Sequence, residues 1–239
     1  MRKGGLLGLA LFLVVLVIVG LIALTFIGLG LLGIFGFGHE KWFSLSNCHC
    51  ECSTMEAGEV REIGTYNGSK VHISNLVGRL VVEEGNSPLV IYSNLPINVS
   101  QVGDEVLITC NECNKYKDGK IIVKGNLSEL EIGDVLGKVE VEVPLRILKV
   151  GDIMGELEVH APVGVFESGD IMGRVSVKAL KLVDVEDVLG ELKVMVPEGY
   201  GVNLKVDDIM GKIKNEAKGE KKVKVNLEDV MGRVEIING

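Results

Sequence analysis

Charged residues are absent from the first part of this 239-residue chain. No Asp, Glu, Lys, Arg or His occurs between Gly4 and Gly38, although 24% of the whole chain is charged. Only Arg2 and Lys3 precede this stretch, so residues 39–239 hold all 33 acids and 23 of the 25 bases, a formal charge of −10. The division excludes one ordinary soluble domain and predicts a membrane segment followed by an acidic domain.

Long apolar runs are absent after Phe37, and an excess of basic residues is absent from the domain that follows. Because a membrane span needs about 20 apolar residues, the first absence excludes a polytopic channel or transporter. The second argues against nucleic-acid binding, which requires clustered bases to neutralise phosphates. The apolar content, 47% of the chain, also argues against disorder.

Catalytic motifs are absent as well. The histidines His39, His49, His72 and His160 are scattered, and no G-x-S-x-G, H-E-x-x-H or P-loop pattern occurs. We therefore expect no enzymatic activity and no catalytic residue.

Residues 6–37 form one apolar run, longer than the about 20 residues that cross a bilayer. We expect a single tilted transmembrane α-helix within residues 1–38; a helical hairpin and a cleaved signal peptide are the alternatives. Arg2 and Lys3 precede the run, so the positive-inside rule places the N-terminus in the cytoplasm and the acidic domain outside the cell. Trp42 and Phe43 are then expected at the outer membrane interface.

One hexapeptide recurs after the membrane segment: Asp, an aliphatic residue, Met or Leu, Gly, a charged residue, an aliphatic residue. Its strict copies begin at Asp134, Asp152, Asp170, Asp187, Asp208 and Asp229, and their glycines are Gly137, Gly155, Gly173, Gly190, Gly211 and Gly232. The glycines are 18, 18, 17, 21 and 21 residues apart. A relaxed copy at Asn75–Leu80 places Gly78 59 residues before Gly137, close to three periods. The repeat is therefore expected to organise residues 60–239.

Apolar and polar residues alternate with period two around each copy, which predicts short strands with one dry face. A repeat of this length cannot bury its own apolar face, so its coils must stack. We predict an all-β fold: a single-stranded parallel β-solenoid with coils of about 18–21 residues, after a Cys-rich linker at residues 39–59. A β-sandwich is the alternative. The predicted core ladders are Val135, Ile153, Ile171, Val188, Ile209 and Val230, and Val139, Leu157, Val175, Leu192, Ile213 and Val234.

The repeat resembles a known family. Units of the form G-D-[IV]-x-G-x-[VIL]-x-V, best matched at Gly151–Val159 and Gly169–Val177, look like the "putative adhesin" or toastrack family, over roughly residues 60–239. The resemblance implies a β-helix-like stack outside the membrane, and in bacteria such domains accompany envelope-stress membrane proteins. The Met or Leu at the fourth position and the cysteines depart from the family pattern. One Gln, with many Lys, Glu and Val residues, favours a thermophilic source.

Cysteines form two groups: Cys48, Cys50 and Cys52, with His49 between the first two, and Cys110 with Cys113. An exterior location favours disulfides, and we expect Cys48 and Cys50 to bond to Cys110 and Cys113. A metal held by the thiolates and unpaired thiols are the alternatives, although the spacing matches no standard zinc ribbon. No other cofactor is expected.

The repeated Asp residues are expected to cap turns by accepting backbone N–H bonds, with calcium binding as the alternative. The Met or Leu of each copy forms a column of Leu136, Met154, Met172, Leu189, Met210 and Met231. The column is either a second core layer or an interaction stripe. Asn67, Asn98 and Asn126 begin N-glycosylation sequons.

These features predict a non-enzymatic, membrane-anchored protein of the cell envelope whose exterior domain is a structural or adhesin-like interaction module. Its expected partners are the lipid membrane, through residues 6–37, and a protein or cell-surface polymer; self-association is a further prediction. The alternatives are a metal-binding or redox role for the cysteines and an accessory subunit of an envelope stress response.

Overall fold

The computed structural model describes residues 55–86 and 88–239. The predictions that concern residues 6–37, His39, Trp42 and Phe43, and those on Cys48, His49, Cys50 and Cys52, lie outside the described residues. Among the described residues, no helix has the length and hydropathy that a membrane crossing requires.

The described chain is all-β, with a single short 3-10 helix, η1 (Cys113–Lys115). Its strands are β1 (Met55–Glu56), β2 (Arg61–Tyr66), β3 (Lys70–Ile73), β4 (Leu76–Glu83), β5 (Leu89–Ser93), β6 (Asn98–Val102), β7 (Glu105–Thr109), β8 (Tyr116–Lys117), β9 (Lys120–Lys124), β10 (Glu129–Ile132), β11 (Val135–Val141), β12 (Leu145–Val150), β13 (Glu156–Ser168), β14 (Arg174–Val188), β15 (Glu191–Val196), β16 (Tyr200–Ile209), β17 (Lys212–Asn215), β18 (Lys221–Val230) and β19 (Arg233–Asn238). Seventeen of them join one sheet, while β1 and β8 pair separately.

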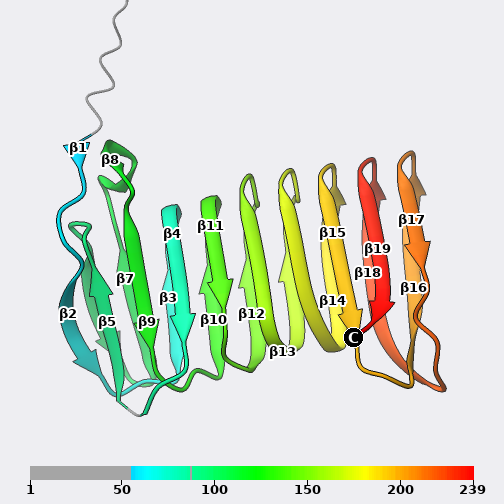
Figure 1. Ribbon diagram of the computed structural model, residues 1–239, viewed down its shortest axis with the longest axis horizontal. Coiled ribbons are helices and arrows are strands. Elements are labelled where there is room, and N and C mark those ends of the chain that lie inside the picture. The colour runs from blue at the N-terminus through cyan, green and yellow to red at the C-terminus, as the bar shows by residue number, and fades with distance from the viewer. Residues whose placement is uncertain (1–54, 87) are drawn as a thin grey trace, which may run out of the picture. The chain divides into compact units, whose positions relative to one another are not determined.

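Most strands pair in parallel with the equivalent strand one repeat away. Ile153 pairs with Val135 on one side and with Ile171 on the other. The sheet winds through two layers that face each other across the core, as Figure 1 shows. One layer holds β10, β12, the later halves of β13 and β14, β18 and β16, and the other holds β11, the first halves of β13 and β14, β15, β19 and β17.

The core lies between the two layers because every second side chain of each strand points inward. Val139, Leu157 and Val175 stack in register, and each is 0% exposed. Burying one such side chain stabilises the fold by about 1.5–3 kcal/mol. The alternation that predicted the strands therefore also places the core.

The order of the last two coils differs from the predicted sequential order. Val188 pairs with Val230, and Val230 pairs in turn with Ile209. The chain thus passes over one position, forms β16 and β17 at the end of the stack, and returns to place β18 and β19 in between, as Figure 1 also shows. The predicted ladder in which Ile209 precedes Val230 is wrong, and so is the one in which Ile213 precedes Val234. The observed inner ladder is Leu76, Val135, Ile153, Ile171, Val188, Val230 and Ile209.

The relaxed copy near the N-terminus is also placed differently from the prediction. Gly78 lies in register with Gly137, so no coil separates them, although their spacing suggested three periods. The intervening residues instead form β7 and β9, which pair with β3 and β4 on their other side. The 59-residue separation of Gly78 and Gly137 is therefore taken up by chain that crosses to the far side of β3 and β4 and returns.

Antiparallel strands complete this end of the sheet, so the prediction of a wholly parallel domain is wrong here. β5 pairs antiparallel with β2 and β9, and β6 with β7. Within the expected linker, β1 pairs with β8. The opposite end has no such covering strands among the described residues, and Ile209 of its last coil is 53% exposed whereas Val230 beside it is 0% exposed.

Candidate functional site

The repeated hexapeptide forms the corners at which the chain passes from one layer to the other. In Figure 1 these corners lie at the upper ends of the strands. The corner backbone is hydrogen bonded from coil to coil: the Ile153 N–H donates to the Asp170 carbonyl at 2.8 Å, and the Met154 N–H donates to the Val135 carbonyl at 2.9 Å. Each copy therefore holds the next in a fixed position.

The repeated glycine is required because successive corners approach each other at this residue. A Cβ on Gly155 would lie 2.7 Å from the carbonyl carbon and the nitrogen of Gly137, and closer still to its oxygen. Gly173, Gly190, Gly232 and Gly211 meet the carbonyl of the neighbouring glycine in the same way. Such distances leave no space for any side chain, so the glycines fix the close spacing of the corners.

The Asp of one copy is hydrogen bonded to the neighbouring corner where a glycine precedes the Asp of the next copy. Asp134 Oδ1 accepts the Asp152 N–H at 3.2 Å, and Asp152 Oδ1 accepts the Asp170 N–H at 3.1 Å. A Cβ on Gly151 would lie 2.6 Å from Asp134 Oδ1, so the absent side chain makes room for the carboxylate. These two carboxylates therefore serve the turn, as side-chain acceptors commonly do.

The later copies lack this preceding glycine, and their strands continue through the Asp. Glu186, Asp207 and Glu228 precede the last three motif Asp residues. Asp229 pairs in register with Asp187 and Asp208 inside β14, β18 and β16. A glycine before the Asp therefore marks the copies in which the strand is interrupted at the corner. An acidic residue before the Asp marks the copies in which the strand continues through it. At the relaxed copy, Asn75 Oδ1 accepts the Asp134 N–H at 3.0 Å. Asn75 therefore takes the role of the Asp, as its position in the relaxed copy predicts.

The Met and Leu column lies on the outside of the corners, not in a second core layer. The exposed fractions of its side chains lie between 44%, at Leu189 and Met231, and 70%, at Met210. We call this column the Met/Leu stripe; in spatial order it consists of Leu136, Met154, Met172, Leu189, Met231 and Met210. Half-buried Val77 precedes Leu136 in register. At the usual strand spacing of about 4.8 Å, the stripe is about 24 Å long.

Charged columns flank the stripe, and the one that follows the glycines is interlinked by ion pairs. Arg79 Nη2 lies 2.6 Å from Glu140 Oε2, and the Arg79 side chain holds the pKa of Glu140 below its ordinary value. Lys138 Nζ lies within 3.2 Å of carboxylate oxygens of Glu140, Glu156 and Glu158, and hydrogen bonds to these groups, that to Glu158 first, raise the pKa of Lys138. These pairs lie on the outer surface, where each adds little to stability.

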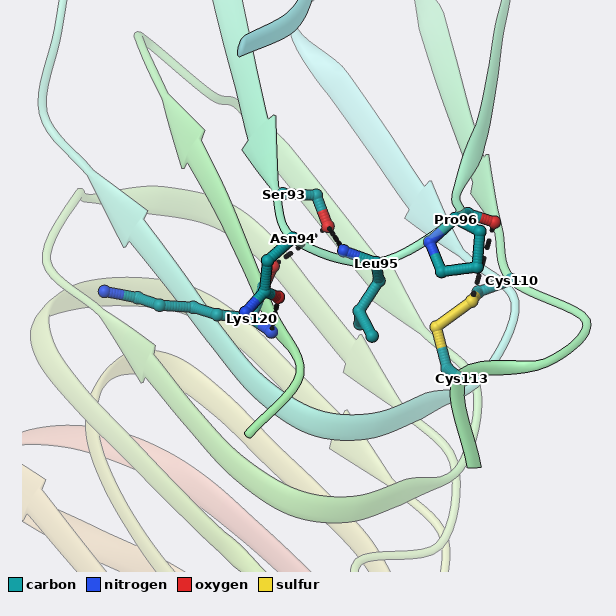
Figure 2. Close-up of a disulfide and its surroundings, with 7 residues drawn as sticks. All are labelled: Ser93, Asn94, Leu95, Pro96, Cys110, Cys113 and Lys120. Carbon is teal, nitrogen blue, oxygen red and sulfur yellow. Dashed lines mark hydrogen bonds between the residues drawn. A yellow bond between two sulfur atoms is a disulfide. The ribbon is translucent and has the colours of Figure 1, made fainter. Parts of the chain in front are cut away.

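The cysteines in the described residues bond to each other. Cys110 and Cys113 form a disulfide, so the expected bonds from these two residues to Cys48 and Cys50 are wrong. Figure 2 shows the disulfide beside Pro96, whose carbonyl lies 4.0 Å from Cys110 Sγ. The same loop is held by Ser93, which accepts the Leu95 N–H at 3.0 Å and donates to the Lys120 carbonyl at 2.9 Å. A metal site that needs these two cysteines as thiolates is incompatible with the disulfide.

One groove in the described residues has a volume of about 480 Å³ and runs beside the glycines that precede the first three motif Asp residues. Its lining includes Gly133, Gly151 and Gly169, with carboxylates such as Glu131 and Glu167. Neither described histidine lines this groove; His72 lies among carboxylates, with its Nδ1 3.7 Å from Glu131 Oε1. Among the described residues, no group of three or more His, Cys, Asp or Glu side chains has the geometry of a metal site.

The sequon asparagines lie on the surface. Asn67, Asn98 and Asn126 are all exposed. The serines of the first and third sequons are brought together, with Ser69 Oγ 3.0 Å from Ser128 Oγ. Ser69 also donates to Asp104 Oδ2 at 2.8 Å, and the side-chain and backbone hydrogen bonds from Ser69 lower the pKa of Asp104. This cluster joins β3, β7 and β10.

Comparison with known proteins gives matches only among solved structures. No protein-family model and no curated protein matches the chain. A "putative cell adhesion protein" from Clostridium sporogenes is 18% identical, with a TM-score of 0.36, over 76% of this chain and 98% of its own. A "putative adhesin" from Bacteroides fragilis is 14% identical, with a TM-score of 0.38, over 76% of this chain and 99% of its own. A "putative lipid binding protein" from Parabacteroides distasonis is 10% identical, with a TM-score of 0.28, over 77% of this chain and 98% of its own. At these identities and TM-scores, none of the likenesses assigns a function to this chain.

Proposed function

We propose that this protein is a non-enzymatic interaction module of the cell envelope, anchored by residues 6–37 and presenting its β domain outside the cell. The observation that carries the proposal is the Met/Leu stripe, a continuous row of exposed apolar side chains that the repeated motif places on one edge of the fold. An exposed apolar row of this length indicates a contact surface.

The domain behind the stripe is, in this proposal, a parallel β-solenoid with two exchanged coils. The parallel pairing of equivalent residues such as Ile153 and Ile171 supports it. The glycine column fixes the spacing of the corners, since no side chain fits between Gly155 and Gly137. The stripe is therefore a rigid surface, and binding to it costs little ordering entropy.

The concave surface also favours a contact role. The groove whose lining includes Gly133, Gly151 and Gly169 is open. Ligand and active sites usually enclose their ligand and converge several polar groups on it. The stripe, by contrast, repeats one chemical feature over the length of the stack, which suits an extended partner.

The proposed location is tested by proteolysis of intact cells. Protease added outside should remove the β domain while a cytoplasmic control protein stays intact. Protection of the domain in intact cells, with cleavage only after lysis, would contradict the exterior location.

The proposed contact role is tested with the photo-crosslinking amino acid benzoylphenylalanine placed at Met172 of the full chain in cells. A control probe replaces Leu180, which is 39% exposed and lies outside the stripe. Irradiation should give a defined higher-mass product for position 172 and none for position 180. Equal product patterns at both positions, or no product at any stripe position, would refute a contact role for the stripe.

A further inference from the structure

The two columns beside the Met/Leu stripe carry opposite charge. On the side that precedes the stripe, every strict copy contributes a carboxylate; we call this the acidic column, Asp134, Asp152, Asp170, Asp187, Asp229 and Asp208 in spatial order. On the side that follows the glycines lies what we call the basic column, Arg79, Lys138, Glu156, Arg174, Glu191, Arg233 and Lys212. Its five bases outnumber its two carboxylates.

The acidic column has little internal compensation. None of its six carboxylates forms an ion pair with another described residue, although neighbouring members are only about 4.8 Å apart along the stack. In the basic column, Arg79, Lys138 and Arg174 are each paired with carboxylates, while Arg233 and Lys212 have no ion pair among the described residues. Excess negative charge therefore lies along one flank of the stripe, and excess positive charge lies along the other, chiefly near β17 and β19.

A surface with this pattern is complementary to itself in one orientation. If two copies meet stripe to stripe about a twofold axis that runs along the stripe, the acidic column of each faces the basic column of the other. If the axis runs across the stripe, acidic faces acidic and basic faces basic, which is unfavourable. In the first arrangement the two stripes also run in the same direction, so that each apolar side chain meets the same residue of the second copy.

We propose that the partner of the Met/Leu stripe is a second copy of this chain, packed in parallel about a twofold axis along the stripe. This inference rests on the proposed contact role of the stripe and adds the identity of the partner. Each copy buries the same apolar row, as a symmetric pair requires. An anionic lipid surface fits less well because the acidic column would face its headgroups.

Orientation is tested by crosslinking the purified full-length chain in a nonionic detergent. Chains with benzoylphenylalanine in place of Leu136 are mixed with isotopically labelled chains of natural sequence, irradiated and digested. The parallel pair predicts crosslinks between chains to the peptides around Leu136 and Met154, because Leu136 lies at the same end of both copies. Crosslinks to the peptides around Met210 and Met231 would indicate the opposite orientation and overturn the proposal.

Charge pairing is tested with Asp229 and Arg233, which flank Met231 and form no ion pair within the described residues. In the parallel pair, Asp229 of each copy faces Arg233 of the other. Asp229→Lys alone, and Arg233→Glu alone, should each weaken dimerisation by about tenfold, since two contacts per dimer are reversed. The double variant should restore it to within about twofold. Sedimentation equilibrium measures each dissociation constant, and circular dichroism checks folding.

The outcomes separate this proposal from the proposed contact role. If a single reversal strengthens dimerisation, like columns face each other and the parallel pair is wrong. If the chain stays monomeric in detergent while the Met172 probe in cells captures a different molecule, the second copy is refuted and the contact role stands. If the stripe gives no crosslink in either setting, both proposals fail.

Discussion

Replacing Gly155 by alanine should disturb the stack at its centre. The added Cβ would lie 2.7 Å from backbone atoms of Gly137 and closer still to its carbonyl oxygen, so it would have to push two coils apart. Gly155 is not among the glycines with positive φ, so the change tests this close approach alone and not backbone strain. Overpacking usually costs about 1–3 kcal/mol, and we expect the upper end because the contacted atoms are backbone that cannot rotate away.

A loss of about 3 kcal/mol is a large part of the about 5–15 kcal/mol that stabilises a typical domain. With a urea m-value of about 2 kcal/mol/M, it lowers the unfolding midpoint by about 1.5 M. The assay is urea unfolding followed by circular dichroism in a nonionic detergent. Gly58→Ala is the matched control because nothing lies within 4 Å of its Cβ position.

The loss of stability should depend on where in the stack the substituted glycine lies. Gly211→Ala makes the same clash, with Gly232, but its coil has a neighbour on one side only and can move outward, so its loss should be smaller than that of Gly155→Ala. The reasoning is refuted if Gly155→Ala unfolds at the same urea concentration as Gly58→Ala.

Three further predictions concern the outer surface. Met172→Asp should leave cooperative thermal unfolding intact because the side chain is 46% exposed; loss of the cooperative transition would place it in the core. Arg79→Gln should lower the unfolding free energy at pH 7 by about 0.5–1 kcal/mol. Because Arg79 lowers the folded-state pKa of Glu140 from its ordinary 4.5, this difference should vanish as the pH falls through the lowered pKa, and a difference that persisted in acid would count against the pair. Ser69→Ala should move the pKa of Asp104 up towards its ordinary 3.8, as followed by NMR titration, since the Ser69 hydroxyl is the first cause of the lowering; an unchanged pKa would contradict that cause.

The period-two pattern predicted most of the parallel core. It placed Val139, Leu157 and Val175 in one buried ladder, and the structure has them in register at 0% exposure. The pattern could not predict the order of the coils, because the same hexapeptide makes every coil fit beside every other. Val230 and Ile209 offer nearly identical side chains to Val188.

The spacing of the copies held a signal for the exchange of coils. The glycines on either side of Gly211 are 21 residues away, whereas the earlier separations are 17 or 18. A chain that passes over one position and then returns needs these extra residues in both connections. Residues such as Glu198, Gly199 and Lys218, which lie outside the strands, supply the added length.

The exposure of the stripe also depended on backbone that the sequence pattern does not specify. Alternation placed Met154 opposite Ile153, but a bend at the corner could have turned it into a second layer. The close approach of Gly155 and Gly137 keeps the corner tight, so Met154 stays outside and is 50% exposed. The Cys110–Cys113 disulfide was similarly decided by the short loop after β7, which brings the two residues together.

Methionine oxidation tests most directly the central claim, that the stripe is a contact surface covered by a second copy of the chain. Met231 and Met55 are each 44% exposed, but only Met231 belongs to the stripe. The full-length chain is treated with hydrogen peroxide at a series of protein concentrations, and each sulfoxide is quantified by mass spectrometry. We predict that Met154, Met172 and Met231 become protected as the concentration rises through the dimerisation range, while Met55 oxidises at a constant rate. Equal rates at all four methionines across the whole range would contradict the account.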